Sequence, residues 1–181
     1  MRPSSLSKIR LVITDIDGVW TDGSLIYGPN GEEIKRFHAR DGLGVRLLQK
    51  ADIQVAVASG RDCAALQRRM RDLDIRLYIN GNMDKAAACR KLMEQAGVLP
   101  EETAFIGDDI PDTAAYACCG IGIAVADAPE YVRAQADLVL KTTGGHGAFR
   151  ELADSILRAQ GRDDLFEPSA ASHFKVMTGA Q

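Results

Sequence analysis

Short apolar runs recur along the chain and alternate with stretches whose apolar residues have helical spacing. The runs predict buried strands at residues 9–14, 54–58, 76–79, 104–106, 121–125 and 138–140. The stretches that follow them predict helices at residues 44–51, 62–73, 84–96, 111–117, 129–136 and 148–159. This alternation is typical of βαβ crossovers, so we expect an α/β fold with a mostly parallel central sheet and helices on both faces.

Two segments depart from the alternation. Residues 25–27 and 32–37 flank the turn Gly28-Pro29-Asn30-Gly31, a pattern that predicts a β-hairpin inserted after the first strand. The helical period ends near Gly161, so residues 161–181 are expected to form a mobile C-terminal tail. We therefore predict one domain at residues 1–160, with a hairpin insertion at residues 23–37.

Composition narrows the classes of function. With 181 residues, 46% hydrophobic and 26% charged, the chain has the make-up of one soluble globular domain. Its 22 basic and 25 acidic side chains offer no general attraction for nucleic acid or an anionic membrane, so an anionic ligand must be met by local positive charge. The four cysteines lack metal-binding spacing, and no stretch reads as a signal peptide or membrane span. We expect free thiols and a cytoplasmic location.

A pair of carboxylates, Asp15 and Asp17, directly follows the first predicted strand. Because one residue separates them, both side chains lie on the same side of an extended chain. A hard dication such as Mg²⁺ relieves their repulsion and also binds phosphate oxygens. A solvated Asp-Gly turn is the alternative, and the position after a buried strand favours the metal site.

The next two predicted strands end in groups that suit an anion. Ser59 and Gly60 offer a hydroxyl and backbone N–H groups, and Arg61 adds a guanidinium that pairs with phosphate or carboxylate. An N-cap serine followed by a surface arginine is the alternative. Lys85 stands at a helix start, where the helix dipole disfavours a cation, and a bound phosphate explains that placement. A tolerated exposed lysine is the alternative there.

The fourth strand is followed by three carboxylates, Asp108, Asp109 and Asp112. Helix capping before Pro111 explains Asp109 or Asp112, since aspartate favours helix starts and proline the first turn. Capping does not explain all three, so at least one is expected to be a metal ligand.

Together these clusters resemble the haloacid dehalogenase superfamily of phosphatases. Residues 15–23, 37–44, 59–61, 107–109 and 144–151 resemble more closely the family of 3-deoxy-D-manno-octulosonate 8-phosphate (KDO 8-phosphate) phosphatases. The resemblance implies a three-layer αβα, Rossmann-type fold. Because the hairpin is the only insertion expected, it also implies that a separate cap domain is absent.

The resemblance further implies the roles of the site residues. Asp15 would be the nucleophile and Asp17 the general acid and base, while Asp15, the Asp17 carbonyl and Asp108 hold Mg²⁺. Asp109 and Asp112 would support this site, and Ser59, Gly60 and Lys85 would bind the phosphoryl oxygens. The substrate site would comprise Asp17, Lys85 and the following residues: His38, Ala39, Arg40, Asp41, Gly42, Arg46, Arg61 and Arg69.

The implied substrate is a small acidic sugar phosphate of lipopolysaccharide inner-core biosynthesis, and four arginines suit its carboxylate and phosphate. The implied assembly is a homotetramer in which a neighbouring hairpin completes each pocket. For Arg46 and Arg69, a solvated helix face is the alternative. For the function, one alternative is a phosphatase for nine-carbon sialic-type 9-phosphates. A second is a receiver-like signalling domain, although its phosphoaccepting aspartate follows a middle strand.

Overall fold

Six parallel strands form the central sheet of the computed structural model, which describes residues 6–167. Their order is β5-β4-β1-β6-β7-β8. The bounds are β1 Leu11–Thr14, β4 Gln54–Ala58, β5 Leu77–Ile79, β6 Thr103–Gly107, β7 Ile121–Ala124 and β8 Leu138–Val139. All four residues of β1 are buried, as expected for a central strand covered on both faces. The six predicted strands are confirmed, with ends that move by one or two residues.

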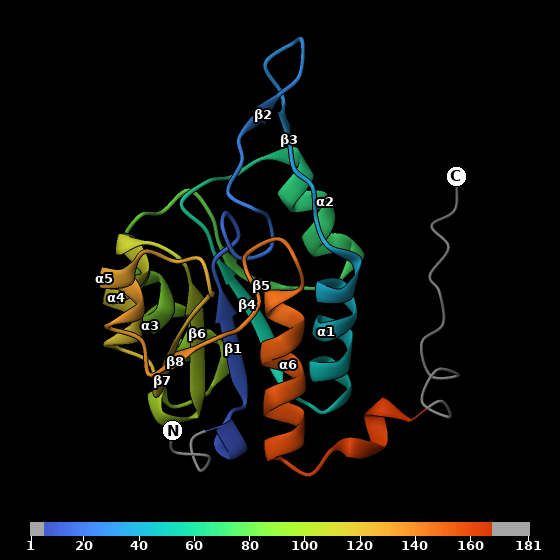
Figure 1. Cartoon of the computed structure of the whole chain (residues 1–181), viewed down its shortest axis with the longest axis vertical. Helices are drawn as coiled ribbons and strands as arrows, with labels where there is room; N and C mark the ends of the chain where they lie inside the picture. Colours follow the sequence, from blue (N-terminus) through green and yellow to red (C-terminus); the bar gives the residue numbers. More distant parts are fainter. Residues whose placement is uncertain (1–5, 168–181) are drawn as a thin grey trace.

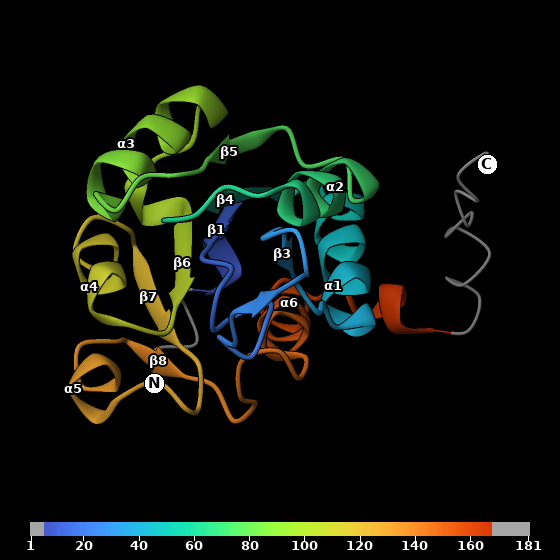
Figure 2. The same cartoon turned by 90° about the horizontal axis from the view of Figure 1, so that it is seen from above.

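Helices cover both faces of this sheet, which confirms the three-layer αβα architecture (Figure 2). On one side lie α1 (Ala39–Lys50), α2 (Ala64–Asp72) and α6 (Ala148–Ala159), and on the other lie α3 (Lys85–Ala96), α4 (Ile110–Tyr116) and α5 (Glu130–Arg133). Figure 1 shows α1 and α6 side by side. A Cβ at Gly44 of α1 would lie 3.2 Å from the Arg150 Cα of α6, so the glycine permits this close approach. Short 3₁₀ turns occur at Leu6–Lys8 and Pro100–Glu102.

Two helices differ from their predicted bounds by more than two residues at one end. The helix predicted from residue 44 begins at Ala39, because the His38 ring accepts a hydrogen bond from the Arg40 N–H and caps the first turn. The helix predicted at 129–136 ends at Arg133. Ser59 is not a helix N-cap, since Cys63 holds that position in α2. The N-cap alternative for Ser59 is therefore wrong.

The predicted hairpin is present but has shorter strands, β2 (Ile26–Tyr27) and β3 (Glu33–Ile34). It closes through a hydrogen bond of 2.8 Å from the Gly28 N–H to the Glu32 carbonyl. The hairpin projects beyond the carboxyl ends of the sheet strands (Figure 1). It is therefore an insertion at the edge where open α/β sheets bind their ligands.

The start of the expected tail is folded. Residues Asp163–Phe166 form a 3₁₀ turn, η3, and Leu165 is buried in the core. The Arg158 guanidinium of α6 lies 5.1 Å from the centre of the Phe166 ring. The prediction of a mobile tail from residue 161 is thus wrong for residues 161–167, which are held by the burial of Leu165 and by a hydrogen bond of 2.9 Å from the Arg162 N–H to the Leu157 carbonyl of α6. The rest of the expected tail, residues 168–181, lies outside the described residues. Within residues 6–167, no helix has the length and apolar character needed to cross a bilayer.

Candidate active site

The carboxyl ends of β1, β4 and β6 meet at one cavity of about 230 Å³. β1 lies between β4 and β6, so the segments that follow these three strands are neighbours. The lining residues are Asp15, Asp17, Gly60, Arg61, Met83, Lys85, Asp108, Asp109, Pro111 and Asp112. The structure therefore brings together residues from all four clusters that the sequence singled out.

Lys85 is the cation at the floor of this cavity. It is the first residue of α3, and its side chain is only 3% exposed. Its ammonium donates hydrogen bonds to the Asp15 carboxylate and, at 2.6 Å, to the Ala58 carbonyl at the end of β4. Burial alone would lower the pKa of Lys85, but attraction to Asp15 and Asp112 raises it. The lysine therefore stays charged. It begins α3 as predicted, and its burial excludes the alternative of an exposed lysine, while its contact with a phosphate stays a prediction.

Three carboxylates converge beside this lysine. Oxygens of Asp15, Asp108 and Asp112 lie within 4.8 Å of one another. Asp112 Oδ2 accepts hydrogen bonds from the N–H groups of Asp108 (2.9 Å) and Asp109 (3.2 Å). Asp112 Oδ1 is buried without a hydrogen-bond partner, and the Lys85 ammonium is 3.5 Å away. One ammonium does not balance three clustered carboxylates, so their mutual repulsion is costly unless a further cation binds.

The electrostatics of these carboxylates agree with a cation site. Burial, with the nearby Asp112 adding to it, raises the pKa of Asp15 to about 7 against the pull of Lys85. Burial and the charge of Asp15 raise the pKa of Asp108 to about 8. The donors are all carboxylate oxygens, which are the ligands that hard dications such as Mg²⁺ prefer. The residues present therefore fit such an ion. Asp112 belongs to the same carboxylate group as Asp15 and Asp108, although the sequence predicted only a supporting role for it.

Gly18, in the turn after β1, lies against the Asp108 carboxylate. Gly18 has φ of +95°, and a Cβ at this position would lie 2.0 Å from Asp108 Oδ2. A side chain here would therefore strain the backbone and displace the carboxylate. Asp109, in contrast, caps α4, since its side chain accepts a hydrogen bond of 2.7 Å from the Ile110 N–H. The capping alternative is correct for Asp109.

The hairpin contributes a residue that the sequence reasoning missed. The Lys35 ammonium lies 2.5 Å from an Asp17 carboxylate oxygen, and its side chain is 3% exposed. A second ion pair joins Arg61 to Glu33 of β3 at 2.9 Å. No local spacing links Lys35 to the acidic pair, because the contact forms only when the hairpin folds back. Met83 is a second missed lining residue, and its sulfur lies over Gly60.

Several residues expected at the substrate site do not line this cavity. Arg46 donates a hydrogen bond of 2.6 Å to the Asp72 carbonyl. Arg69 donates one of 3.3 Å to the His38 carbonyl and lies over the Phe37 ring. Asp41 is buried, which raises its pKa, and it accepts a hydrogen bond from the Arg150 N–H. The expected residues without a place in the cavity lining are Ser59, His38, Ala39, Arg40, Asp41, Gly42, Arg46 and Arg69.

Ser59 directly precedes Gly60, which does line the cavity. Its side chain is buried, and its hydroxyl accepts a hydrogen bond of 3.2 Å from the Arg61 N–H. The bond ties Ser59 to the turn after β4. The expected anion-binding corner is thus a short turn and not the first turn of α2.

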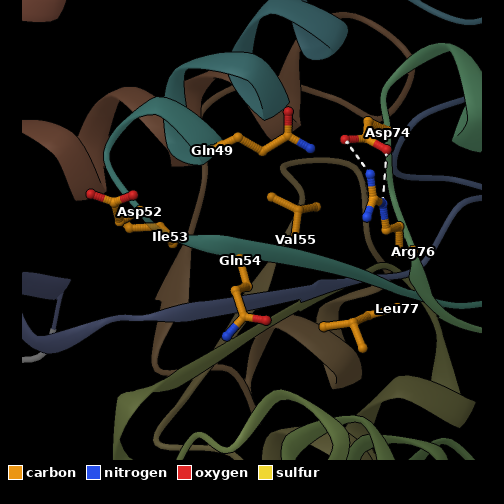
Figure 3. A pocket seen from close by; sticks show the side chains of 8 residues that line it. All are labelled: Gln49, Asp52, Ile53, Gln54, Val55, Asp74, Arg76 and Leu77. Atoms are coloured by element: carbon orange, nitrogen blue, oxygen red, sulfur yellow. Dashed lines mark hydrogen bonds and ion pairs between the residues drawn. The ribbon is translucent and has the colours of Figure 1, made fainter.

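A larger hollow, of about 530 Å³, lies at the opposite end of the sheet (Figure 3). It is lined by residues at the amino ends of β4 and β5 and by Gln49 of α1. Two of its three charged residues, Asp74 and Arg76, pair with each other at 3.0 Å, and the third is Asp52. Ligands of open α/β sheets bind at the carboxyl ends of the strands, so the smaller cavity is the candidate active site.

Comparison with known proteins agrees with this geometry. Residues 78–152 match the family model of haloacid dehalogenase-like hydrolases. The chain is 57% identical over 162 residues to the 3-deoxy-D-manno-octulosonate 8-phosphate phosphatase of Haemophilus influenzae, covering 90% of each sequence. It is 41% identical over 157 residues to the phosphatase of the same name from Escherichia coli K12, covering 87% of this chain and 84% of that protein.

Solved structures show the same similarity. The cobalt-bound form of the Haemophilus influenzae phosphatase has a TM-score of 0.90 and 55% identity, covering 94% of this chain and 99% of that one. The Moraxella catarrhalis phosphatase, solved with magnesium, phosphate and KDO, has a TM-score of 0.88 and 37% identity, covering 95% and 97%. This chain therefore belongs to the 3-deoxy-D-manno-octulosonate 8-phosphate phosphatase family of the haloacid dehalogenase superfamily.

Proposed function

We propose that this chain is a Mg²⁺-dependent phosphatase that hydrolyses 3-deoxy-D-manno-octulosonate 8-phosphate to the free sugar acid and phosphate, a step of lipopolysaccharide inner-core biosynthesis. The observation that carries the proposal is the convergence of Asp15, Asp17, Lys85 and Asp108 on one cavity in a member of this family. These groups supply a carboxylate nucleophile, an acid, a cation and a metal ligand. A receiver-like signalling role is disfavoured, because the acidic clusters follow β1 and β6 and the family is one of hydrolases.

In the proposed reaction Asp15 attacks phosphorus in line with the departing sugar oxygen. The bond from phosphorus to that oxygen breaks as the bond to the Asp15 carboxylate forms, and Asp17 gives its proton to the leaving alkoxide. Asp17 then takes a proton from a water molecule, which attacks the aspartyl-phosphate, releases inorganic phosphate and restores Asp15. Splitting the displacement into two steps means that water attacks an acyl phosphate, whose carboxylate leaving group departs more easily than the sugar alkoxide.

Other groups of the cavity hold the phosphoryl oxygens. Lys85 places an ammonium beside the attacking carboxylate, and the turn of Ser59 and Gly60 offers a hydroxyl and backbone N–H groups. Asp15, Asp108 and the Asp17 carbonyl would hold Mg²⁺, with Asp112 beside them. When bound, the ion neutralises repulsion between the nucleophile and the phosphate. Donors placed before the reaction stabilise the charge of the transferring group.

Among the arginines expected to bind the sugar, Arg61 is the one that lines the cavity, and we propose that it contacts the sugar end of the substrate. Its guanidinium can pair bidentately with the carboxylate of an acidic sugar. Arg61 forms an ion pair with Glu33 of the hairpin. A bound substrate must therefore either displace the Glu33 carboxylate or bind the guanidinium together with it. The expected substrate contacts of Arg40, Arg46 and Arg69 stay predictions.

We further propose that the enzyme is a homotetramer in which hairpins cover neighbouring active sites. The hairpin exposes four large apolar side chains, Leu25, Ile26, Tyr27 and Ile34, each between 44% and 59% exposed. Such side chains on a small protrusion favour burial against a partner, and an isolated two-stranded hairpin is marginally stable in water. We expect Ile26→Asp to lower the mass measured by light scattering, with Tyr78→Asp, an exposed residue of β5, as the matched control.

A cytoplasmic location completes the proposal. The four cysteines are free thiols, a state that persists in reducing compartments. KDO 8-phosphate is a small, charged, water-soluble substrate, and it suits an enzyme of that compartment.

The deciding experiment compares acidic sugar phosphates as substrates. Phosphate release from KDO 8-phosphate, from a nine-carbon sialic-type 9-phosphate and from a simple aryl phosphate is measured with excess Mg²⁺. We expect the highest kcat/KM for KDO 8-phosphate. A higher value for the nine-carbon substrate would replace the proposed substrate while leaving the phosphatase chemistry intact, and no turnover of any of them would contradict both.

A further inference from the structure

Three thiols meet between α3 and the turn that follows α4. Cys89 is on α3, and Cys118 and Cys119 directly follow Ala117, which ends α4. Their sulfur atoms lie within 4.8 Å of one another. Cys89 is fully buried, whereas Cys118 and Cys119 are half-buried and leave a path from solvent. None of the three lines the candidate active-site cavity, so they form a separate cluster, here called the thiol cluster.

The backbone holds the thiol cluster together. The N–H groups of both Cys118 and Cys119 donate hydrogen bonds of 3.1 Å to the Ala115 carbonyl, so the turn keeps these consecutive residues against α3. The Cys118 sulfur lies 3.4 Å from the Ala115 carbonyl oxygen and 3.9 Å from that of Ala86 on α3. The thiol of α3 and the two thiols of the turn after α4 therefore converge before any ligand binds. This arrangement lowers the entropy cost of binding a ligand.

The electrostatics favour a thiolate at one member of this cluster, Cys118. Hydrogen bonds from Cys119 and then Cys89 lower the pKa of the Cys118 thiol, and the positive charge of Arg90 acts in the same direction. Hydrogen bonding to Cys118 raises the pKa of both Cys89 and Cys119. Cys118 is therefore the thiol that loses its proton first. It is half-buried, so its thiolate is accessible to a cation from solvent. Thiolate is the form of cysteine that binds metals.

We propose that Cys89, Cys118 and Cys119 bind a soft d¹⁰ cation, Cu⁺ or Zn²⁺, through three thiolates. Thiolates select such cations, whereas the carboxylates of the active site suit hard ones, so the two sites differ in the metal they take. Binding releases the thiol protons that remain, and a water molecule can complete the coordination of Zn²⁺. The alternative is that the three cysteines only pack as small apolar side chains.

This site would also tie together two elements of the candidate active site. Lys85 begins α3 about one turn before Cys89, and Asp112 lies in the first turn of α4. A cation bound by the thiol cluster would join α3 to the end of α4. We therefore expect bound cation to raise the melting temperature of the protein, since a ligand that binds the folded state stabilises it.

The test uses the full chain, reduced with a phosphine, in excess Mg²⁺ so that the carboxylates are occupied. Cd²⁺ is the probe, because thiolate-to-Cd²⁺ charge transfer gives an ultraviolet absorption band that carboxylates do not produce. We expect the band to saturate at about one Cd²⁺ per chain, as for a single site of three thiolates. Added Zn²⁺ should displace Cd²⁺ and remove the band, and Cd²⁺ should raise the melting temperature.

Single variants then assign the ligands. Cys89→Ala and Cys119→Ala should lose most of the band, and Cys63→Ser, at the start of α2 and outside the cluster, should keep it. Circular dichroism checks that each variant is folded. If the buried Cys89→Ala does not fold, Cys118→Ala at the half-exposed position takes its place. No band in the wild-type protein would show that the thiols only pack together. A band that survives all folded cluster variants, or that Cys63→Ser removes, would also overturn the proposal.

Discussion

The ammonium of Lys35 lies 2.5 Å from a carboxylate oxygen of Asp17, although eighteen residues separate the two along the chain. Lys35 follows β3 of the hairpin, and Asp17 follows β1 of the sheet. The contact positions the carboxylate that the proposed mechanism uses as acid and base. It also ties the end of the hairpin that follows β3 to Asp17 of the same chain.

Lys35→Met tests this contact. We expect kcat/KM to fall about tenfold or more, because a buried hydrogen bond between charged groups is worth about 1.5–3 kcal/mol. The matched control is Arg36→Met, whose ion pair with Asp22 is largely exposed and should matter little. Steady-state kinetics of both variants decide the point. Equal losses in the two would indicate that the whole hairpin, and not the Asp17 contact, sets the rate.

Asp15→Asn tests the nucleophile. We expect turnover to fall on the order of 10⁴-fold or more, as when a covalent nucleophile is removed. The fold should persist, because the amide is close in shape to the carboxylate. Asp22→Asn is the control, since Asp22 does not line the cavity and bonds the Ser24 N–H and the exposed Arg36 guanidinium. Substantial phosphate release by the purified, folded Asp15→Asn protein would refute the assignment.

Removal of metal tests the carboxylate site. We expect EDTA to abolish phosphate release and added Mg²⁺ to restore it. Asp108→Asn should raise the Mg²⁺ concentration needed for half-maximal rate, because it removes one anionic ligand from the trio. Asp137→Asn, on the loop before β8, is the matched control and should respond to Mg²⁺ like the wild type. Turnover that is indifferent to EDTA would contradict the site.

The pH dependence of stability follows from the raised pKa values of Asp15 and Asp108. In the metal-free protein these groups have pKa values of about 7 and about 8, against 3.8 in the unfolded chain. The folded state therefore binds more protons between pH about 4 and 8, and the free energy of unfolding contributed by these groups falls as pH rises through that window.

Urea unfolding at several pH values measures this dependence. Excess Mg²⁺ should flatten it, because bound metal favours the charged carboxylates. Asp108→Asn should reduce the slope in metal-free buffer, since it removes one of the titrating groups. A metal-free protein whose stability rises steadily from pH 5 to about 8 would be evidence against buried, protonated carboxylates in this cavity.

Local signals were enough to predict much of the fold. Strand β4 and helix α6 have the predicted bounds, because their apolar periodicity is uninterrupted. The error at the start of α1 arose because the cap is His38, which is not among the favoured N-cap residues. The error at η3 arose because Leu165 is buried in the hydrophobic core by the tertiary fold, which local composition does not reveal.

The sequence by itself determined which groups reach the carboxyl edge of the sheet. A parallel sheet places every strand end at one edge, so Asp15, Lys85 and Asp108 could be assigned to a common site from their positions after buried strands.

Tertiary structure alone decided which of these groups touch. The Asp17–Lys35 pair, the place of Asp112 in the acidic trio and the thiol cluster each join segments distant in the chain. Arg46 and Arg69 likewise point to backbone carbonyls and not into the cavity. Such contacts depend on how the helices pack and on how the hairpin folds back to the sheet. The spacing of residues along the chain does not predict either.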